Sequence, residues 1–175
     1  MIISLLVYLD DPEGSLFFTQ LRCGKDGRQF KMFKFRTMIM DAEKHLDELR
    51  DLNERDDIVF KIKNDPRITR FGKILRKTGL DELPQFLNVL LGDMSVVDPR
   101  PPLPSEVSEY NDRWMLRLKV RPGVTCTWQI APNRDDIPSA KWLSMDIDYI
   151  LDQSFLYDLK VIFMTVFAVF RGDGH

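Results

Sequence analysis

Segment 76–92 constrains the fold most, because it changes from basic to acidic to apolar over a short distance. Asp81 and Glu82 are adjacent, and most residues between Pro84 and Gly92 are apolar. This order predicts a helix with Asp81 at its N-cap, Pro84 in its first turn and Gly92 at its end. Two carboxylates would then lie at the start of a helix, next to cationic side chains.

This pair of carboxylates has two interpretations. In one, Asp81 caps the helix and Glu82 offsets the positive end of the helix macrodipole. In the other, the two side chains bind a metal ion and attack a phosphate group. The pair alone does not separate these interpretations, so the neighbouring sequence has to.

Length and charge narrow the classes of protein. The chain has 175 residues, 44% hydrophobic and 30% charged, which predicts one domain with its own core. A net charge of -2 argues against a general nucleic-acid binder. The charges are segregated, with an acidic stretch over residues 41–57 between two basic blocks. These blocks predict an anionic ligand or an anionic membrane surface. The blocks comprise Arg22, Lys25, Arg28, Lys31, Lys34 and Arg36, and then Lys61, Lys63, Arg67, Arg70, Lys73, Arg76 and Lys77.

Cysteines and apolar segments limit the setting. Cys23 and Cys126 are the only cysteines, which provides no disulfide framework and fits a reducing cytosol. A membrane-spanning helix needs about 20 apolar residues. Neither residues 2–9 nor residues 161–170 form so long a segment, so no spanning helix is predicted.

Two aromatic-rich stretches, 16–22 and 29–36, are separated by a turn-forming segment that contains Gly24 and Gly27. They predict a β-hairpin. Lys34 and Arg36 are two residues apart and therefore share one face of the second strand. They could hold phosphate oxygens together, or they could line a solvated face.

Helices are predicted over 40–53, 105–120, 140–151 and 155–170, and from Asp65-Pro66 onward, with a short extended piece at 60–65. In the helix from Asp65, basic residues that include Arg67 are expected to point outward, to solvent or to anionic lipid headgroups. The last helix is apolar on nearly every side, so it is either buried or in a membrane interface. A proline-stiffened loop over 96–104 would hold Arg100 rigidly. The predicted fold is α+β and mostly helical, a single domain with a small β-hairpin and amphipathic membrane-interface helices.

Three motifs carry a resemblance to a known family. They are Arg76-Lys77-Thr78-Gly79-Leu80-Asp81-Glu82-Leu83-Pro84-Gln85, then Lys34-Phe35-Arg36-Thr37-Met38, and Gly92-Asp93-Met94-Ser95 leading to Pro99-Arg100-Pro101. With these motifs in matching order, the chain resembles the bacterial sugar transferases called polyprenyl-phosphate glycosylphosphotransferases. These are monotopic phosphoglycosyl transferases that initiate exopolysaccharide and glycan assembly. The resemblance extends from about residue 11 to the C-terminus.

The resemblance implies transfer of a sugar 1-phosphate from a nucleotide-diphosphate sugar, by default a UDP-sugar, to undecaprenyl phosphate, with release of UMP. It assigns the nucleophile of a covalent aspartyl-phosphosugar intermediate to Asp81 and its partner carboxylate to Glu82. Both carboxylates are candidate ligands of Mg²⁺, which prefers oxygen ligands. Candidate phosphate-binding cations are Lys34, Arg36, Arg76, Arg100 and Arg121.

The resemblance also implies a setting. The expected partners are a nucleotide-diphosphate sugar, a polyprenyl phosphate lipid and a membrane surface, without nucleic acid, and a homo-oligomer is left open. The expected location is the cytoplasmic face of the bacterial inner membrane, with the protein peripheral or monotopic. Residues 1–10 are interpreted as the remnant of a shortened N-terminal membrane-associated helix, and residues 11–175 as the catalytic domain.

The sequence departs from the family pattern at several positions. Asp98 and Cys126 stand where the family usually has glycine, and Gly79 stands where it usually has serine. Asp98 is expected to strain the backbone and to place a negative charge beside a phosphate site. The alternative function is therefore a catalytically weak or inactive homologue that binds lipid or nucleotide sugar within a polysaccharide assembly complex.

Overall fold

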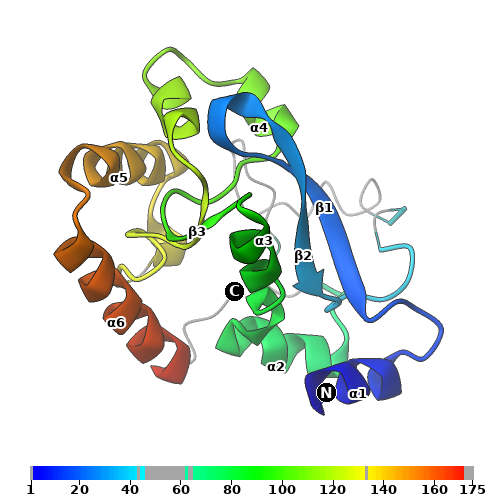
Figure 1. Cartoon of the computed structure of the whole chain (residues 1–175). Coiled ribbons are helices and arrows are strands. Elements are labelled where there is room, and N and C mark those ends of the chain that lie inside the picture. Colours follow the sequence, from blue (N-terminus) through cyan, green and yellow to red (C-terminus); the bar gives the residue numbers. More distant parts are fainter. Residues whose placement is uncertain (1, 43, 46–61, 63–64, 133, 172–175) are drawn as a thin grey trace.

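The structure is a computed structural model that describes residues 2–42, 44–45, 62, 65–132 and 134–171. It begins with helix α1 (Ile2–Asp10), followed by the antiparallel strands β1 (Phe17–Cys23) and β2 (Gln29–Phe35). The turn η1 (Lys25–Gly27) joins these strands. The predicted hairpin is thus confirmed, and it lies along one side of the molecule (Figure 1).

The acidic pair lies in a tight turn between two helices. Helix α2 (Arg70–Thr78) ends at Gly79, the single 3₁₀ turn η3 (Leu80–Glu82) follows, and helix α3 (Gln85–Leu91) ends at Gly92. The predicted stop at Gly92 is confirmed, whereas the predicted N-cap at Asp81 is wrong. Asp81 is inside η3, no side chain caps α3, and the position before α3 is occupied by Pro84.

The helix predicted from Asp65-Pro66 begins later, because Thr69 is its N-cap and its side chain accepts a hydrogen bond from the backbone N–H of Gly72. Arg67 does not point outward. Its guanidinium is buried, lies 2.6 Å from Asp65 and donates to the carbonyl of Ala42. Asp65 therefore forms a local turn with Arg67 instead of starting a helix.

Part of the sequence prediction lies outside the described residues. Of the predicted helix at 40–53, the described residues 40–42 and 44–45 form turns, and Asp41 has a φ of 57°. The rest of that helix and most of the extended piece at 60–65 cannot be compared.

A parallel pair of short strands, β3 (Ser95–Val97) and β4 (Gly123–Thr125), was not predicted. The predicted helix at 105–120 is also wrong, since the chain forms helix α4 (Pro104–Ser108) and then the 3₁₀ segment η4 (Trp114–Lys119). The side chain of Asn111 accepts a hydrogen bond from the backbone N–H of Trp114, so the chain forms a local turn between α4 and η4.

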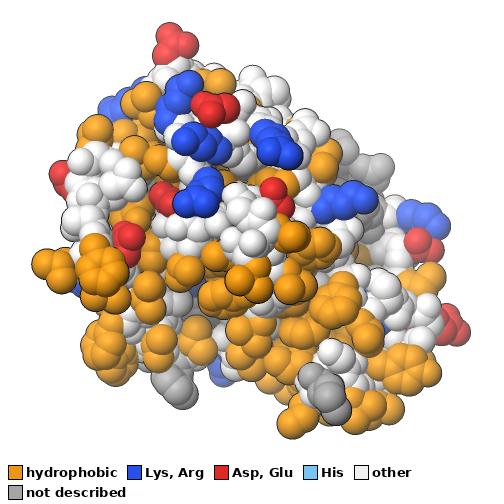
Figure 2. Space-filling model, viewed as in Figure 1, with side chains coloured by type: hydrophobic (Ala, Val, Ile, Leu, Met, Phe, Trp, Pro, Cys, Tyr) orange, Lys and Arg blue, Asp and Glu red, His pale blue; other side chains and the backbone are white. Residues whose placement is uncertain are grey.

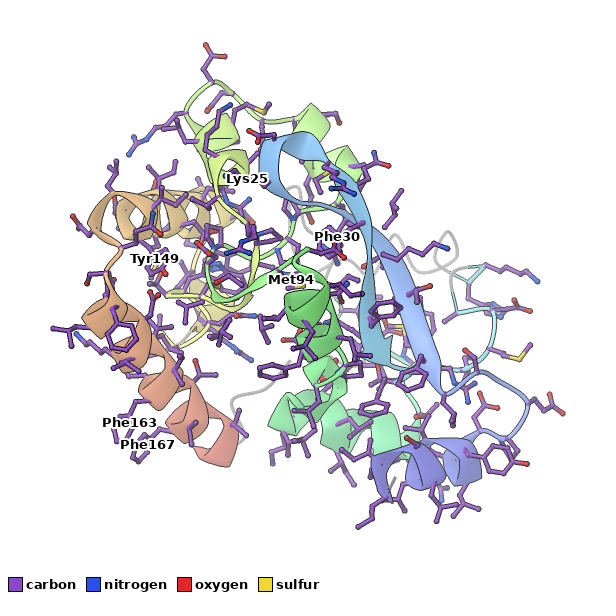
Figure 3. The ribbon with its side chains drawn as sticks, in the orientation of Figure 1. Lys25, Phe30, Met94, Tyr149, Phe163 and Phe167 are labelled. Atoms are coloured by element: carbon purple, nitrogen blue, oxygen red, sulfur yellow. The ribbon has the colours of Figure 1, made fainter. Side chains whose placement is uncertain are left out.

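The C-terminal helices α5 (Ser139–Asp152) and α6 (Phe155–Arg171) are confirmed, and the 3₁₀ turn η5 (Arg134–Asp136) precedes them. Tyr149 and Val161 pack with β3, whereas Phe163 and Phe167 point away from the body of the protein (Figure 3). A second cluster joins Phe30 of the hairpin to Met94. The mostly helical α+β class is confirmed, and none of the helices in the described part of the chain is long and apolar enough to cross a membrane.

Replacing Gly79 is expected to change the stability of the protein, because this residue has a φ of 67° and ends α2 just before the acidic pair. An added Cβ would meet only Val169 at 3.9 Å, so the cost of Gly79→Ala is that of the left-handed backbone. We expect Gly79→Ala to lower the free energy of unfolding by about 1 to 2 kcal/mol, measured by urea denaturation. Gly79→Asn is the matched variant and should cost less, because asparagine tolerates this conformation. Equal free energies of unfolding for the wild type, Gly79→Ala and Gly79→Asn would contradict the left-handed conformation of Gly79.

Candidate functional site

The centre of the candidate site is the contact between the acidic pair and Lys34. The Nζ atom of Lys34 lies 2.6 Å from Oε1 of Glu82 and 3.8 Å from Oδ2 of Asp81. The side chains of Asp81 and Glu82 are only 10% and 19% exposed. Strand β2 thus supplies a cation to two nearly buried carboxylates of η3.

Local structure explains this placement. The left-handed turn at Gly79 reverses the chain after α2, and η3 then packs against β2. Arg76, in the last turn of α2, is fixed by a 2.9 Å hydrogen bond from its Nε atom to Oγ1 of Thr37. Its charge acts on Asp81. Lys34 and Arg76 therefore approach the pair from two elements.

The pKa values of the two carboxyl groups are shifted in opposite directions. Burial raises the pKa of Asp81, although the charges of Lys34 and Arg76 oppose this effect. Burial also opposes ionisation of Glu82, but Lys34 outweighs it and lowers the pKa of Glu82, assisted by Arg100 and Gln85. The charge of Arg76 favours ionised Asp81, but desolvation has the larger effect on its pKa.

The carboxylates are compatible with a magnesium ion. Mg²⁺ is usually held by one or two carboxylates, with waters and substrate phosphates completing its shell. Asp81 and Glu82 supply that number of carboxylates. Within the described ranges, no group of three or more acidic, histidine or cysteine side chains forms a complete protein cage. The residues therefore fit a metal that is shared with a phosphorylated substrate.

Arg100 and Arg22 extend the cationic surroundings. The charge of Arg100 lowers the pKa of Glu82, and the phosphate-binding role of Arg100 stays a prediction. Arg22, which is 5% exposed, was not predicted as a site residue. Burial and the charge of Arg100 lower its pKa to about 10, and Glu82 also acts on it. In the sequence, the membership of Arg22 in the first basic block was the feature that pointed to it. The strand pattern did not distinguish it from the other basic residues of that block.

Two predicted phosphate-binding residues are not brought to the pair by the contacts that the structure shows. Arg36 lies 2.6 Å from Oδ2 of Asp11 and also donates to the Asp11 carbonyl. It therefore does not pair with Lys34 as the strand spacing suggested, because β2 ends at Phe35. Arg121 is exposed, and its charge acts on Asp98. Their role in binding phosphate stays a prediction.

Asp98 does not strain the backbone. Among the described residues other than glycine, only Asp26 and Asp41 have positive φ, so the expected strain at Asp98 is wrong. Its side chain is buried, and Oδ1 has no hydrogen-bond partner. Burial raises its pKa to about 7, together with the charges of Asp158 and Asp146 and against Ser95 and Arg121. The substitution therefore affects electrostatics rather than conformation.

The other two departures are also accommodated. Cys126 is 2% exposed, and its backbone N–H donates to Oε1 of Gln129. Gly79 occupies a left-handed position that suits glycine better than serine. None of these three residues disturbs the contact between Lys34 and the acidic pair.

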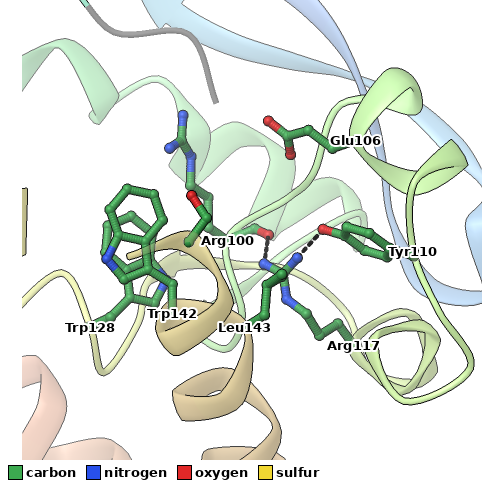
Figure 4. Close-up of a pocket in the computed structure, with 8 residues that line it drawn as sticks. Arg100, Glu106, Tyr110, Arg117, Trp128, Trp142 and Leu143 are labelled. Atoms are coloured by element: carbon green, nitrogen blue, oxygen red, sulfur yellow. Dashed lines mark hydrogen bonds between the residues drawn. The ribbon is translucent and has the colours of Figure 1, made fainter. Parts of the chain in front are cut away.

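A small pocket of about 40 Å³ lies beside Arg100 (Figure 4). The stacked indole rings of Trp128 and Trp142, with centroids 4.4 Å apart, lie on one side, and Tyr110 and Arg117 lie on the other. A cavity needs about 10 to 15 Å³ of such volume to hold one water molecule, so this pocket has room for a few waters or a small ligand group.

Together these residues define a class of site. Two carboxylates, one held ionised by a lysine, are surrounded by guanidinium groups from three separate elements. Such a site is suited to binding a phosphorylated ligand with or without a divalent cation.

Comparison with known proteins assigns the family. The family model for bacterial sugar transferases matches residues 1–172. The chain is 40% identical over 178 aligned positions to exopolysaccharide production protein ExoY of Rhizobium meliloti, covering 99% of this chain and 78% of ExoY. The chain therefore belongs to the bacterial sugar transferase family.

Other relatives are longer proteins. Galactosyl transferase CpsE of Streptococcus agalactiae is 42% identical over 92% of this chain and 36% of its own length. UDP-glucose:undecaprenyl-phosphate glucose-1-phosphate transferase of Escherichia coli is 40% identical over 96% of this chain and 35% of its own length. The chain thus spans about a third of these two relatives and more than two thirds of ExoY.

The raised pKa of Asp98 predicts that the contribution of this residue to stability depends on pH. Its folded pKa of about 7 lies above the ordinary value of 3.8, so the folded state binds the proton more tightly. Stability from this group is complete below pH 3.8 and is lost as the pH rises to about 7. The free energy of unfolding of Asp98→Asn, measured by thermal unfolding, should equal that of the wild type at pH 4. It should exceed that of the wild type at pH 8 by about 1 to 3 kcal/mol. The exposed Asp148, replaced by Asn, is the control. A pH-independent difference for Asp98→Asn would contradict the burial of its charge.

Proposed function

We propose that the protein transfers a sugar 1-phosphate from a UDP-sugar to undecaprenyl phosphate and releases UMP, as an initiating step of exopolysaccharide or glycan assembly. The observation that carries the proposal is the nearly buried Asp81–Glu82 pair clamped by Lys34. Family membership supports the reaction class. The names of the Escherichia coli and Salmonella relatives support an undecaprenyl phosphate acceptor.

The proposed reaction has two displacements at phosphorus. A carboxylate oxygen of Asp81 attacks the phosphorus that bears the sugar, and the bond from this phosphorus to the UMP oxygen breaks, with its electron pair leaving on UMP. A phosphate oxygen of undecaprenyl phosphate then attacks the same phosphorus, and the bond to Asp81 breaks. Asp81 must be ionised for the first step, which Lys34 and Arg76 favour against its burial.

The surrounding residues position the phosphates and stabilise charge. Lys34, Arg76 and Arg100 lie where developing negative charge can be stabilised, and such electrostatic effects dominate phosphoryl transfer. Glu82, with Asp81, would hold Mg²⁺, which when bound neutralises the charge of the pyrophosphate. Glu82 otherwise stays paired with Lys34, so it keeps the ammonium group beside the nucleophile.

The nucleophile can be tested by intact-protein mass spectrometry after incubation with Mg²⁺ and UDP-glucose or UDP-galactose, without acceptor lipid. The expected result is a hexose-phosphate adduct on the wild type that is absent from Asp81→Asn. Asp93→Asn, at a carboxylate beyond the end of α3 and outside the pair, is the matched control and should retain the adduct. An adduct on Asp81→Asn would exclude the proposed nucleophile.

Addition of undecaprenyl phosphate to this assay, together with a measurement of UDP-sugar binding, tests the alternative. A folded wild type that binds a UDP-sugar but gives neither an adduct nor lipid product would be the inactive homologue considered from the sequence. Among the interactions that the structure shows, neither Asp98 nor Cys126 contacts the acidic pair.

We propose that one apolar face rests on the cytoplasmic surface of the bacterial inner membrane. Figure 2 shows hydrophobic side chains gathered over the lower part of the molecule, where Figure 1 places α1, α2, α3 and α6, whereas lysines and arginines are more frequent above. Exposed members of these helices include Leu5, Leu9, Ile74, Phe86, Leu90, Leu91, Phe163 and Phe167. This face would place the site near the phosphate of a lipid acceptor.

Membrane association can be tested with the whole chain and vesicles of phosphatidylglycerol and phosphatidylcholine. Leu90 and Leu91 are 83% and 70% exposed, so replacing both by Glu leaves the core intact. We expect co-sedimentation to weaken at least about tenfold, because each leucine contributes about 1.5 to 3 kcal/mol when buried. The control replaces Met115 and Leu116 of η4, at the opposite end of the molecule (Figure 1), by Glu. Equal binding of both variants would contradict this docking face.

A further inference from the structure

The loop between β3 and α4 carries Arg100 and is anchored in an unusual way. Pro99, Pro101 and Pro102 lack backbone N–H groups, so this segment can be tied down mainly through its carbonyl oxygens. Four consecutive carbonyls each accept a hydrogen bond. The donors to residues 99, 100, 101 and 102 are the N–H of Gly123 at 2.9 Å, Nη2 of Arg117 at 3.0 Å, Nη1 of Arg22 at 3.0 Å and the N–H of Cys23 at 2.9 Å.

The donor to the Arg100 carbonyl is itself firmly held. Arg117 is 7% exposed, and its Nε and Nη2 atoms lie 2.9 and 2.8 Å from Oδ2 of Asp146, which is 1% exposed. Its Nη1 atom donates to the hydroxyl of Tyr110. The guanidinium fork therefore connects α5, the segment before η4 and the Arg100 loop through a single side chain.

The orientation of the two arginines separates their functions. In Figure 4 the carbonyl of Arg100 faces Arg117, whereas the guanidinium of Arg100 points away from it. The Arg100 charge acts on Glu82, while the main attractive charges on Arg117 are those of Asp146 and Tyr110. Arg117 can thus influence the acidic pair through the main chain that it fixes.

We propose that Arg117, held by Asp146, is a positioning residue for sugar-phosphate transfer, because it fixes the Arg100 main chain and so aims the Arg100 guanidinium at the substrate phosphates beside Glu82. This inference rests on the proposed function. A lysine at position 117 would keep the charge opposite Asp146. It could not reproduce the fork that also reaches the Arg100 carbonyl and Tyr110.

A double-mutant cycle tests whether Arg117 acts through Arg100. Transfer from UDP-galactose or UDP-glucose to undecaprenyl phosphate is measured as kcat/KM for wild type, Arg100→Ala, Arg117→Lys and the double variant. We expect each single variant to lose about 10- to 100-fold, because small misplacements at a reacting centre have effects of this size. The double variant should be within about threefold of Arg100→Ala alone, since residues that act as a unit are not additive.

Arg67→Lys is the matched control, because Arg67 is also a buried arginine that pairs with an aspartate and donates to a backbone carbonyl. It should lower the thermal midpoint as Arg117→Lys does while kcat/KM stays unchanged. If Arg117→Lys does not fold, the double-mutant cycle with Arg100→Ala is measured with Asp146→Asn in its place.

The outcomes separate the two proposals. An active wild type with losses that multiply in the double variant would overturn the positioning role of Arg117 and leave the proposed function standing. Loss of kcat/KM in Arg67→Lys equal to that in Arg117→Lys would also overturn it. No transfer by the folded wild type with either donor would overturn the proposed function and this inference with it.

Discussion

The ammonium group of Lys34 is the charge on which the acidic pair depends. Burying two adjacent carboxylates is costly unless a cation compensates them, because desolvation and mutual repulsion both disfavour the ionised forms. Lys34 lies within 4 Å of both, and Arg76 adds a second cation from α2. The hairpin, α2 and η3 must therefore be packed together before these cations can compensate the acidic pair.

The Arg100 loop shows a second way in which the fold prepares this site. Proline restricts the loop conformation but removes backbone donors, so the loop depends on donors from its surroundings. Two of these donors are buried arginines, whose guanidinium groups hold the main chain of the loop in place. Arg22 and Arg117 thus connect the hairpin, η4 and α5 to the chain segment that follows β3.

Local patterns were sufficient for the longer elements and insufficient for the shorter ones. The hairpin, α5 and α6 have strong patterns and turns or breaks at their ends, and they form as predicted. The three-residue strands β3 and β4 have no pattern long enough to detect, and they exist because they pair with each other across the molecule. The helix break near Asn111 and the turn at Asp65 were missed because polar side chains there bond to nearby backbone groups.

The sequence by itself determined the family, the acidic pair, the stop at Gly92 and the place of Arg100 in a proline-rich segment, because these depend on residue identity and short-range order. Only the tertiary structure decided which cations meet the pair. By strand spacing, Lys34 and Arg36 were equally good candidates to lie near the pair. In the structure Lys34 contacts Glu82, whereas Arg36 contacts Asp11. Charge pairing depends on distance in space, and spacing along a strand does not specify which element packs against it.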